Sequence, residues 1–92
     1  MNRLDKTMMR GEGMYINITV DLSHYHRPSL DLRISDRQPV RQLIQTVWKI
    51  NGISDPPRPG YWVRVSNKAQ MIRGYEVLRD KKISSGDKLT VL

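Results

Sequence analysis

Two segments near the start of the chain alternate between apolar and polar residues. In residues 15–22 one face carries Ile16, Ile18, Val20 and Leu22. In residues 30–34 one face carries Leu30, Leu32 and Ile34. A period of two residues is typical of a half-buried strand. The polar segment between them, residues 23–28, ends in proline and predicts a turn, so the two strands are expected to form a hairpin.

The apolar period then changes to that of a helix. The apolar positions after Pro39 are Val40, Leu43, Ile44 and Val47. They predict a helix over residues 39–50 with one buried face. Pro39 suits the first helical position, where its missing N–H needs no partner. Ser35 and Asp36 are candidate N-caps, and Gly52 can end the helix in a left-handed conformation. Trp48 lies at the edge of the apolar stripe and is expected to be half buried.

The second half of the chain predicts three further strands. Three prolines in residues 54–60 exclude regular structure there. Residues 61–65 alternate as a strand with Tyr61, Val63 and Val65 on one face, and Asn67 and Lys68 form a turn before a short strand at residues 69–72.

Residues 73–92 predict a loop, a turn and a closing strand. Leu78 and Ile83 are expected to anchor the loop in the core. The sequence Ser85-Gly86-Asp87 predicts a tight turn, and residues 88–92 close the sheet with Leu89 and Val91 inward. The element order ββαβββ predicts an α+β fold, in which one helix packs on one face of a five-stranded mixed sheet.

Length and composition narrow the classes of protein. Ninety-two residues make one domain. The chain has no cysteine, which excludes disulfides and cysteine-ligated metals. No apolar run approaches the roughly 18–20 residues that span a bilayer, and the first residues lack the apolar core of a secretory signal. A soluble cytoplasmic protein is therefore expected.

The chain is basic, with a formal net charge of +7. Residues 1–13 hold 3 of the 16 basic and 2 of the 9 acidic residues, so residues 14–92 carry +6. A positive balance indicates nucleic acid, an anionic membrane surface or an acidic protein as partner. The basic residues are scattered singly, except for the adjacent Lys81 and Lys82, which disfavours nucleic acid and leaves it as the alternative.

The first 13 residues are polar and without period. One interpretation is a disordered tail. The other is a translated leader, because purine-rich codons of the ribosome-binding type can encode residues 10–13 and Met14 follows at once. In both interpretations the folded domain comprises residues 14–92.

No residue pattern predicts catalysis, a cofactor or a metal site. His24 and His26 flank Tyr25 in the predicted turn, but two ligands do not make a structural zinc site. Ser84, Ser85 and Asp87 are explained as turn formers. The protein is therefore not expected to be an enzyme.

Several segments together resemble one family of ubiquitin-like proteins. The segments are MYINITVDLSHY, DLRISD, PVRQLI, PPRPGYWVRVSNK and GDKLTVL. They resemble the YukD/EsaB family, small β-grasp proteins that accompany the type VII secretion systems of Gram-positive bacteria. The resemblance covers residues 14–92 and is specific as a combination. It implies a β-grasp fold and a role as an accessory or regulatory component of the secretion apparatus, in the cytoplasm or at the inner face of the membrane.

The last residues of the sequence indicate whether such a protein would be conjugated to others or would bind them non-covalently. Conjugation of ubiquitin requires a flexible Gly-Gly arm at its C-terminus, whereas this sequence ends in Leu92 at the close of a predicted strand. The resemblance therefore implies non-covalent binding through the folded surface. Conjugation by another route is a third and weaker hypothesis.

The expected binding surface is the outward face of the sheet. If the strands pair as in the resembled fold, this outward face comprises Asn17, Thr19, Arg33, Trp62, Arg64, Lys88 and Thr90. Arg64 stands where ubiquitin has the central aliphatic residue of its apolar patch. Trp62 is either an interface anchor or packed flat on its own sheet. The expected partners are protein components of the secretion machinery, including membrane-associated ones. Nucleic acid, bound through Arg33, Trp62 and Arg64, is the alternative, and homodimerisation through an edge strand stays open.

Overall fold

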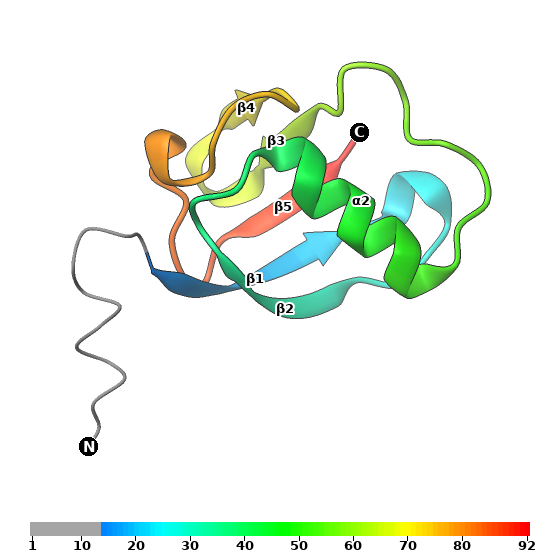
Figure 1. Cartoon of the computed structure of the whole chain (residues 1–92), viewed down its shortest axis with the longest axis horizontal. Coiled ribbons are helices and arrows are strands. Elements are labelled where there is room, and N and C mark those ends of the chain that lie inside the picture. The colour runs from blue at the N-terminus through cyan, green and yellow to red at the C-terminus, as the bar shows by residue number, and fades with distance from the viewer. Residues whose placement is uncertain (1–13) are drawn as a thin grey trace.

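The computed structural model describes residues 14–92, and the predicted tail or leader at residues 1–13 lies outside the described residues. The described chain contains β1 (Tyr15–Asp21), β2 (Leu30–Ser35), α2 (Val40–Asn51), β3 (Val63–Val65), β4 (Gln70–Ile72) and β5 (Lys88–Val91) (Figure 1). Short 3₁₀ helices occur at Ser23–Tyr25, Ser66–Lys68 and Arg79–Lys81. This order is the predicted ββαβββ order.

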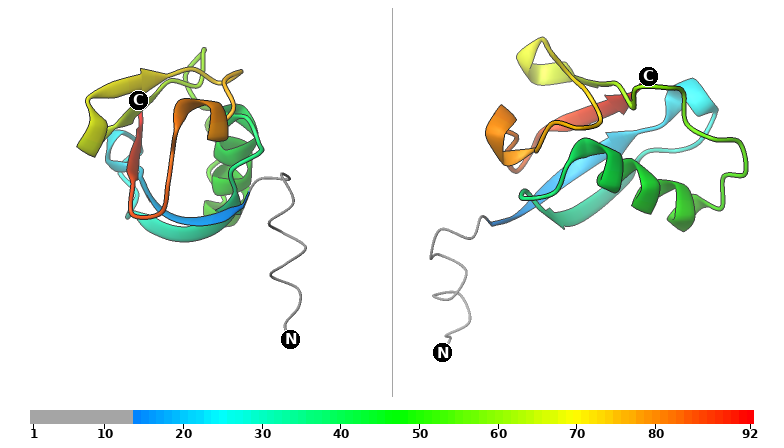
Figure 2. Two further views of the ribbon diagram at one scale, coloured as in Figure 1. Left: turned by 90° about the vertical axis from the view of Figure 1, so that its left-hand side faces the viewer. Right: turned by 45° about the horizontal axis from the view of Figure 1, so that its top comes forward.

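The five strands form one mixed sheet in the order β2-β1-β5-β3-β4. Strand β1 pairs antiparallel with β2 and parallel with β5. Strand β3 pairs antiparallel with both β4 and β5. The last strand of the chain therefore lies at the centre of the sheet beside the first. Figure 2 shows α2 lying across one face of this curved sheet, which confirms the predicted α+β arrangement.

The core lies between α2 and the inward face of the sheet. All predicted apolar positions of α2 are buried, and so are the inward residues of β1, β3 and β5. Leu78 and Ile83 are also buried, as predicted for the loop anchors. Each fully buried aliphatic side chain contributes about 1.5–3 kcal/mol to folding.

The start of α2 differs from the prediction. Pro39 is the N-cap and not the first helical residue, because it is extended (ψ 156°) and forms a β-bridge with Val77. Asp36 does not cap the helix, because its Oδ1 accepts a hydrogen bond from the Met14 main-chain N–H at 2.9 Å. The Ser35 hydroxyl accepts one from the N–H of Arg37 at 3.2 Å. The predicted end at Gly52 is confirmed, with φ +60°.

Strands β3 and β4 are shorter than predicted, because turns precede both. Tyr61 has a left-handed conformation, φ +51°, and its N–H donates to the Arg58 carbonyl at 3.3 Å. The Gly74 N–H donates to the Gly60 carbonyl at 3.0 Å, which holds this turn against the loop after β4. Regular pairing of β3 therefore begins only at Val63. Ala69 also has a positive φ, +48°, and lies outside β4.

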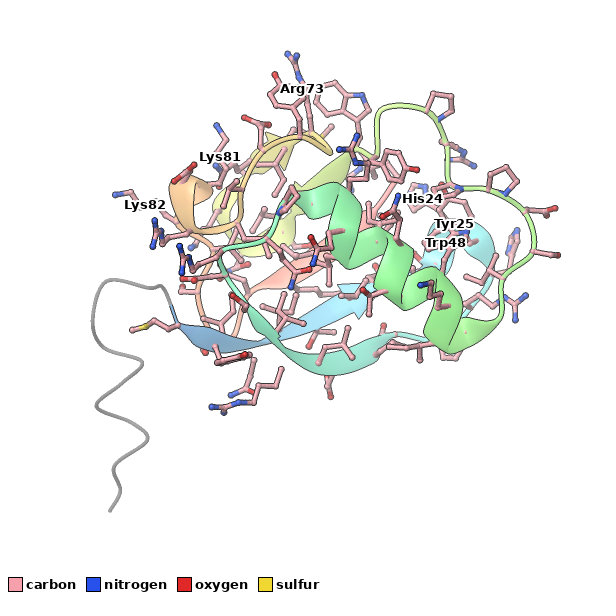
Figure 3. The ribbon with its side chains drawn as sticks, in the orientation of Figure 1. His24, Tyr25, Trp48, Arg73, Lys81 and Lys82 are labelled. Atoms are coloured by element: carbon pink, nitrogen blue, oxygen red, sulfur yellow. The ribbon has the colours of Figure 1, made fainter. Side chains whose placement is uncertain are left out.

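Two aromatic residues fix the proline-rich loop that leads to β3. Trp48 is only 7 % exposed, so it is more buried than predicted. Its Nε1 donates to the Asp55 carbonyl at 2.7 Å, and the Tyr25 ring meets it edge-on with 4.8 Å between centroids (Figure 3). The Tyr25 hydroxyl donates to the Leu92 main-chain oxygen at 2.7 Å and accepts from the Arg58 N–H at 3.1 Å. Tyr25 therefore joins the first turn, the loop and the last residue of the chain.

Candidate binding surface

The strand register determines which side chains share the outward face of the sheet. Residues that face each other across paired strands point to the same side. The register places Asn17 opposite Arg33, Thr19 opposite Lys88, and Arg64 opposite Thr90. Because side chains alternate along each strand, these six residues point away from α2. That they bind a protein stays a prediction.

Thr90 has the predicted direction but does not contribute to the accessible surface. It is 5 % exposed, and its Oγ1 donates to Asp21 Oδ2 at 3.2 Å. The reason is its position in β5, at the centre of the sheet, where neighbouring strands cover it on both sides. Thr19 is half buried and donates through its Oγ1 to Asp31 Oδ1 at 2.7 Å. The two threonines are therefore engaged within the sheet.

Trp62 combines the two arrangements that the sequence left open. It packs on its own chain, since a Cβ atom built on Gly60 would lie 2.8 Å from both Cδ1 and Nε1 of the indole. The guanidinium carbon of Arg73 lies 5.0 Å from the centre of the indole ring, a cation–π contact. Trp62 is nevertheless 37 % exposed, and its Nε1 donates to no residue in 14–92. The indole is therefore held in place and is still partly exposed to solvent.

A hollow of about 360 Å³ opens beside Trp62 on the outward face. We use "the hollow" for the site lined by Arg58, Pro59, Trp62, Met71 and Leu92. Met71 is opposite Arg64 in the register and is 48 % exposed. The Leu92 N–H donates to the Trp62 carbonyl at 3.0 Å, which brings the end of the chain to the hollow.

Sequence reasoning found only Trp62 among the residues of the hollow. Met71 could have been added, because it alternates with the inward Ile72 in a predicted strand. Arg58 and Pro59 had no such signal, since their place depends on the fold of an irregular loop. The sequence places Leu92 in the last strand but does not predict which face of the sheet it lies on.

The arginines around the hollow form no salt bridge in the described part of the chain. Its two salt bridges, Lys68–Asp87 and Lys81–Glu76, each measure 2.9 Å. Neither involves Arg58, Arg64 or Arg73. The Arg73 guanidinium, labelled in Figure 3, donates to the Tyr75 hydroxyl at 3.1 Å. The main-chain N–H of the same residue donates to Glu76 Oε1 at 2.7 Å, so Arg73 has one acidic neighbour. Arg58 and Arg64 form no salt bridge, and arginines therefore outnumber acids at this end of the outward face.

Asp87 has a structural role in the turn before β5. It accepts hydrogen bonds from Asn67 Nδ2 at 2.8 Å and the Ser84 N–H at 3.0 Å, and it pairs with Lys68. Burial by itself raises the pKa of Asp87. The three donors and the charge of Lys68 outweigh burial, so the pKa lies below its ordinary value of 3.8.

The structure also places the other residues that were considered for catalysis or metal binding. The Ser85 hydroxyl accepts a hydrogen bond from the Asn17 N–H at 3.1 Å, which ties the turn to β1. His24 and His26 are exposed at the first turn, and His26 has φ +59°. Residues 14–92 contain no group of three His, Cys, Asp or Glu side chains that could hold a metal ion. In the same range no helix is long and apolar enough to cross a membrane.

Comparison with protein families gives a match over nearly all of the described chain. The family model described as "WXG100 protein secretion system (Wss), protein YukD" matches residues 15–91. The ESX secretion system protein YukD of Bacillus subtilis (strain 168) is 46% identical over 79 residues, which is 86% of this chain and 100% of that protein. Both findings confirm the resemblance seen in the sequence.

Comparison with solved structures concerns the fold alone, because identities are low. The C-terminal ubiquitin-like domain of mouse tubulin-specific chaperone e has a TM-score of 0.63 at 16% identity, covering 90% of each chain. A ubiquitin from Caldiarchaeum subterraneum has a TM-score of 0.62 at 15% identity, covering 84% of this chain and 90% of that one. These neighbours confirm the predicted ubiquitin-like β-grasp fold.

Proposed function

Because the chain belongs to the YukD family of WXG100, or ESX, secretion-system proteins, we propose that it is a non-enzymatic accessory component of such a system. It acts by binding other proteins non-covalently, through the outward face of its sheet. It works in the cytoplasm and is recruited to the inner face of the membrane by the components that it binds.

The observation that carries this proposal is that one face of the sheet presents an exposed tryptophan together with arginines that form no salt bridge in residues 14–92. Trp62 and Arg64 are both exposed, and they lie on the side of the sheet opposite α2. Tryptophan and arginine are enriched among the residues that dominate protein–protein binding energy. A solvent-facing sheet surface that presents both residue types is suited to a protein partner.

Leu92 is held on the fold beside the proposed binding face. Its N–H donates to the Trp62 carbonyl, and its main-chain oxygen accepts from the Tyr25 hydroxyl. These two bonds fix the backbone next to Trp62, which favours binding through a preformed surface.

The test is affinity capture from native cells of the protein tagged before Met14, with and without nuclease. We expect secretion-system proteins to be captured in both conditions, with the bait as one unmodified band on a denaturing gel. Trp62→Ala and Arg64→Glu should reduce the capture. Arg79→Glu is the matched control, because Arg79 is exposed on a 3₁₀ helix away from the outward face.

Each contrary result has a distinct meaning. Normal capture by both outward-face variants would show that another surface binds. Bait of higher mass that survives denaturation would indicate conjugation. The absence of secretion-system proteins from the wild-type capture would refute the accessory role.

The net charge of +6 over residues 14–92 favours a second candidate function, binding of RNA or DNA. Arg33, Trp62 and Arg64 would then contact the nucleic acid. Such binding falls steeply with salt, because each neutralised phosphate releases counterions. A gel-shift titration at low salt tests it, and no shift would eliminate this candidate.

A further inference from the structure

The walls of the hollow are suited to an apolar side chain. Trp62, Met71, Leu92 and Pro59 present carbon atoms to it, and two of them, Trp62 and Met71, are exposed large apolar residues. Exposed apolar surface that is concave and rimmed by polar groups is typical of interaction sites. The volume of about 360 Å³ suits one large side chain and not a folded element.

Cations border this apolar floor from three directions. Arg58 comes from the proline-rich loop and lies against Tyr25, with 5.3 Å from its guanidinium carbon to the ring centre. Arg73 comes from the segment after β4 and covers Trp62. Arg64 lies opposite Met71 in β3. Since none forms a salt bridge within residues 14–92, each can pair with a carboxylate of a partner.

The arrangement at Trp62 favours a peptide over a nucleic acid base. A base binds an aromatic side chain by stacking on an open face of its ring. Arg73 occupies one face of the Trp62 indole, so that face is not free for stacking. Trp62 lines the hollow and is 37 % exposed, and its Nε1–H donates to no residue in 14–92, so it can donate to a carbonyl or carboxylate of a peptide.

The positive charge around the hollow also indicates which kind of protein segment can bind there. A second copy of the chain would bring another domain of charge +6 against a cationic rim. The chain's own residues 1–13 carry a net charge of +1. Both would be repelled, whereas an acidic segment of another protein would be attracted and steered to the site.

From these observations we propose that the hollow docks an acidic segment of a partner protein. The segment inserts one large aliphatic or aromatic side chain between Trp62, Met71 and Leu92, and its carboxylates meet Arg58, Arg64 and Arg73. This inference rests on the proposed function, since it specifies the chemistry of the protein that the outward face binds.

A random 12-residue peptide library displayed on phage, selected against the immobilised full chain, tests the chemistry directly. We expect the selected sequences to place Asp and Glu around one large apolar residue. Replacing that residue by alanine should weaken binding of the synthetic peptide about tenfold or more, measured by fluorescence anisotropy. Selected peptides without acidic residues, or no selection at all, would overturn the proposal.

Two pairs of variants locate the binding. Met71→Glu places an acid in the hollow and should weaken binding about tenfold or more. Met14→Glu makes the same change at an exposed methionine outside the hollow and should bind normally. Equal binding by both variants would overturn the proposed site.

The second pair uses two glycines with nearly equal φ. Gly60 has φ +90° and Gly86 has φ +94°, so alanine introduces similar backbone strain at each. Only Gly60→Ala must displace the Trp62 indole, because nothing lies within 4 Å of a Cβ at Gly86. We expect Gly60→Ala to weaken peptide binding and Gly86→Ala to leave it unchanged. Normal binding by Gly60→Ala would contradict a role for Trp62 in the hollow.

A competition experiment separates nucleic acid from peptide. A single-stranded DNA oligonucleotide should fail to displace the selected peptide at physiological salt, and complete displacement would favour the nucleic-acid alternative. The peptide experiments are independent of the capture from cells. If secretion-system proteins are captured but no acidic peptide is selected, the accessory role stands and the hollow does not serve it.

Discussion

Tyr25→Phe is the sharpest test of how the proline-rich loop is held. The change removes one oxygen atom and retains the ring, which packs edge-on against Trp48. It eliminates two hydrogen bonds, one donated to the Leu92 oxygen at 2.7 Å and one accepted from the Arg58 N–H at 3.1 Å. Both connect segments far apart in sequence, so no local interaction replaces them.

The expected loss of stability follows from the surroundings of these two bonds. A hydrogen bond contributes a net of about 0.5–1.5 kcal/mol to folding, and a buried partner left unpaired adds to the loss. The bond to Leu92 is partly buried and should contribute in full. The Arg58 N–H is exposed, so water can replace the hydroxyl there at a smaller loss. We expect Tyr25→Phe to lower the free energy of unfolding by about 1–2 kcal/mol.

Urea denaturation measures this change. For a domain of this size the free energy of unfolding falls by about 1 kcal/mol per molar urea, so the midpoint should fall by about 1–2 M. Tyr61→Phe is the matched control, because Tyr61 packs on the core but its hydroxyl makes no hydrogen bond within residues 14–92. Equal midpoints for the two variants would refute the assignment of the loop's anchorage to the Tyr25 hydroxyl.

Three further variants test other parts of the fold and surface. Because the pKa of Asp87 is lowered by folding, its stabilising effect is present above the unfolded pKa of about 3.9 and is lost as pH falls through the lower folded pKa. Asp87→Asn should therefore flatten the fall of the melting temperature between about pH 5 and pH 2. Leu78→Ala should lower the free energy of unfolding in urea by about 2–5 kcal/mol, because Leu78 is fully buried. Thr90→Val should lower it by about 1 kcal/mol and leave partner capture unchanged, since Thr90 is buried; reduced capture would show that this position matters for binding.

Hydrophobic periodicity predicted the elements whose residues are buried on one side. Strands β1 and β2 and the buried face of α2 follow from it because alternation and helical spacing record directly which side chains face the core. Leu78 and Ile83 were predictable as anchors for a related reason, since each is a large aliphatic residue in an otherwise polar segment and both are buried.

The predicted ends and caps of helices and strands were wrong where contacts with distant residues determine them. The sequence around Pro39 favours a first helical position, yet the bridge to Val77 holds it in an extended conformation. Asp36 has the chemistry of an N-cap, yet its carboxylate receives the Met14 N–H. Tyr61 fits a strand by alternation, but it lies in a turn with a positive φ, in which its N–H donates to the Arg58 carbonyl and the neighbouring Gly60 carbonyl accepts from the Gly74 N–H. The partners Val77, Met14 and Gly74 are all distant in sequence.

The hollow could not be predicted for a similar reason, because its five residues come from the loop, from β4, from the position just before β3 and from the position just after β5. Its walls at Arg58 and Pro59 belong to no regular element, so their position depends on the hydrogen bonds of Tyr25 and Trp48. Without the Tyr25 hydroxyl, the loop should adopt the hydrogen-bonded conformation that lines the hollow for a smaller fraction of the time. The apparent dissociation constant rises by the inverse of that fraction.

Tyr25→Phe should therefore weaken binding of a selected acidic peptide under conditions where the variant is still fully folded. Circular dichroism establishes that the variant is folded, and anisotropy then gives the dissociation constant at the same temperature. The effect should be smaller than that of Met71→Glu, because the variant leaves every residue of the hollow in place. Tyr61→Phe should bind as the wild type. If folded Tyr25→Phe also binds as the wild type, the loop keeps its conformation without the hydroxyl, and the Tyr25 hydroxyl is not needed to form the hollow.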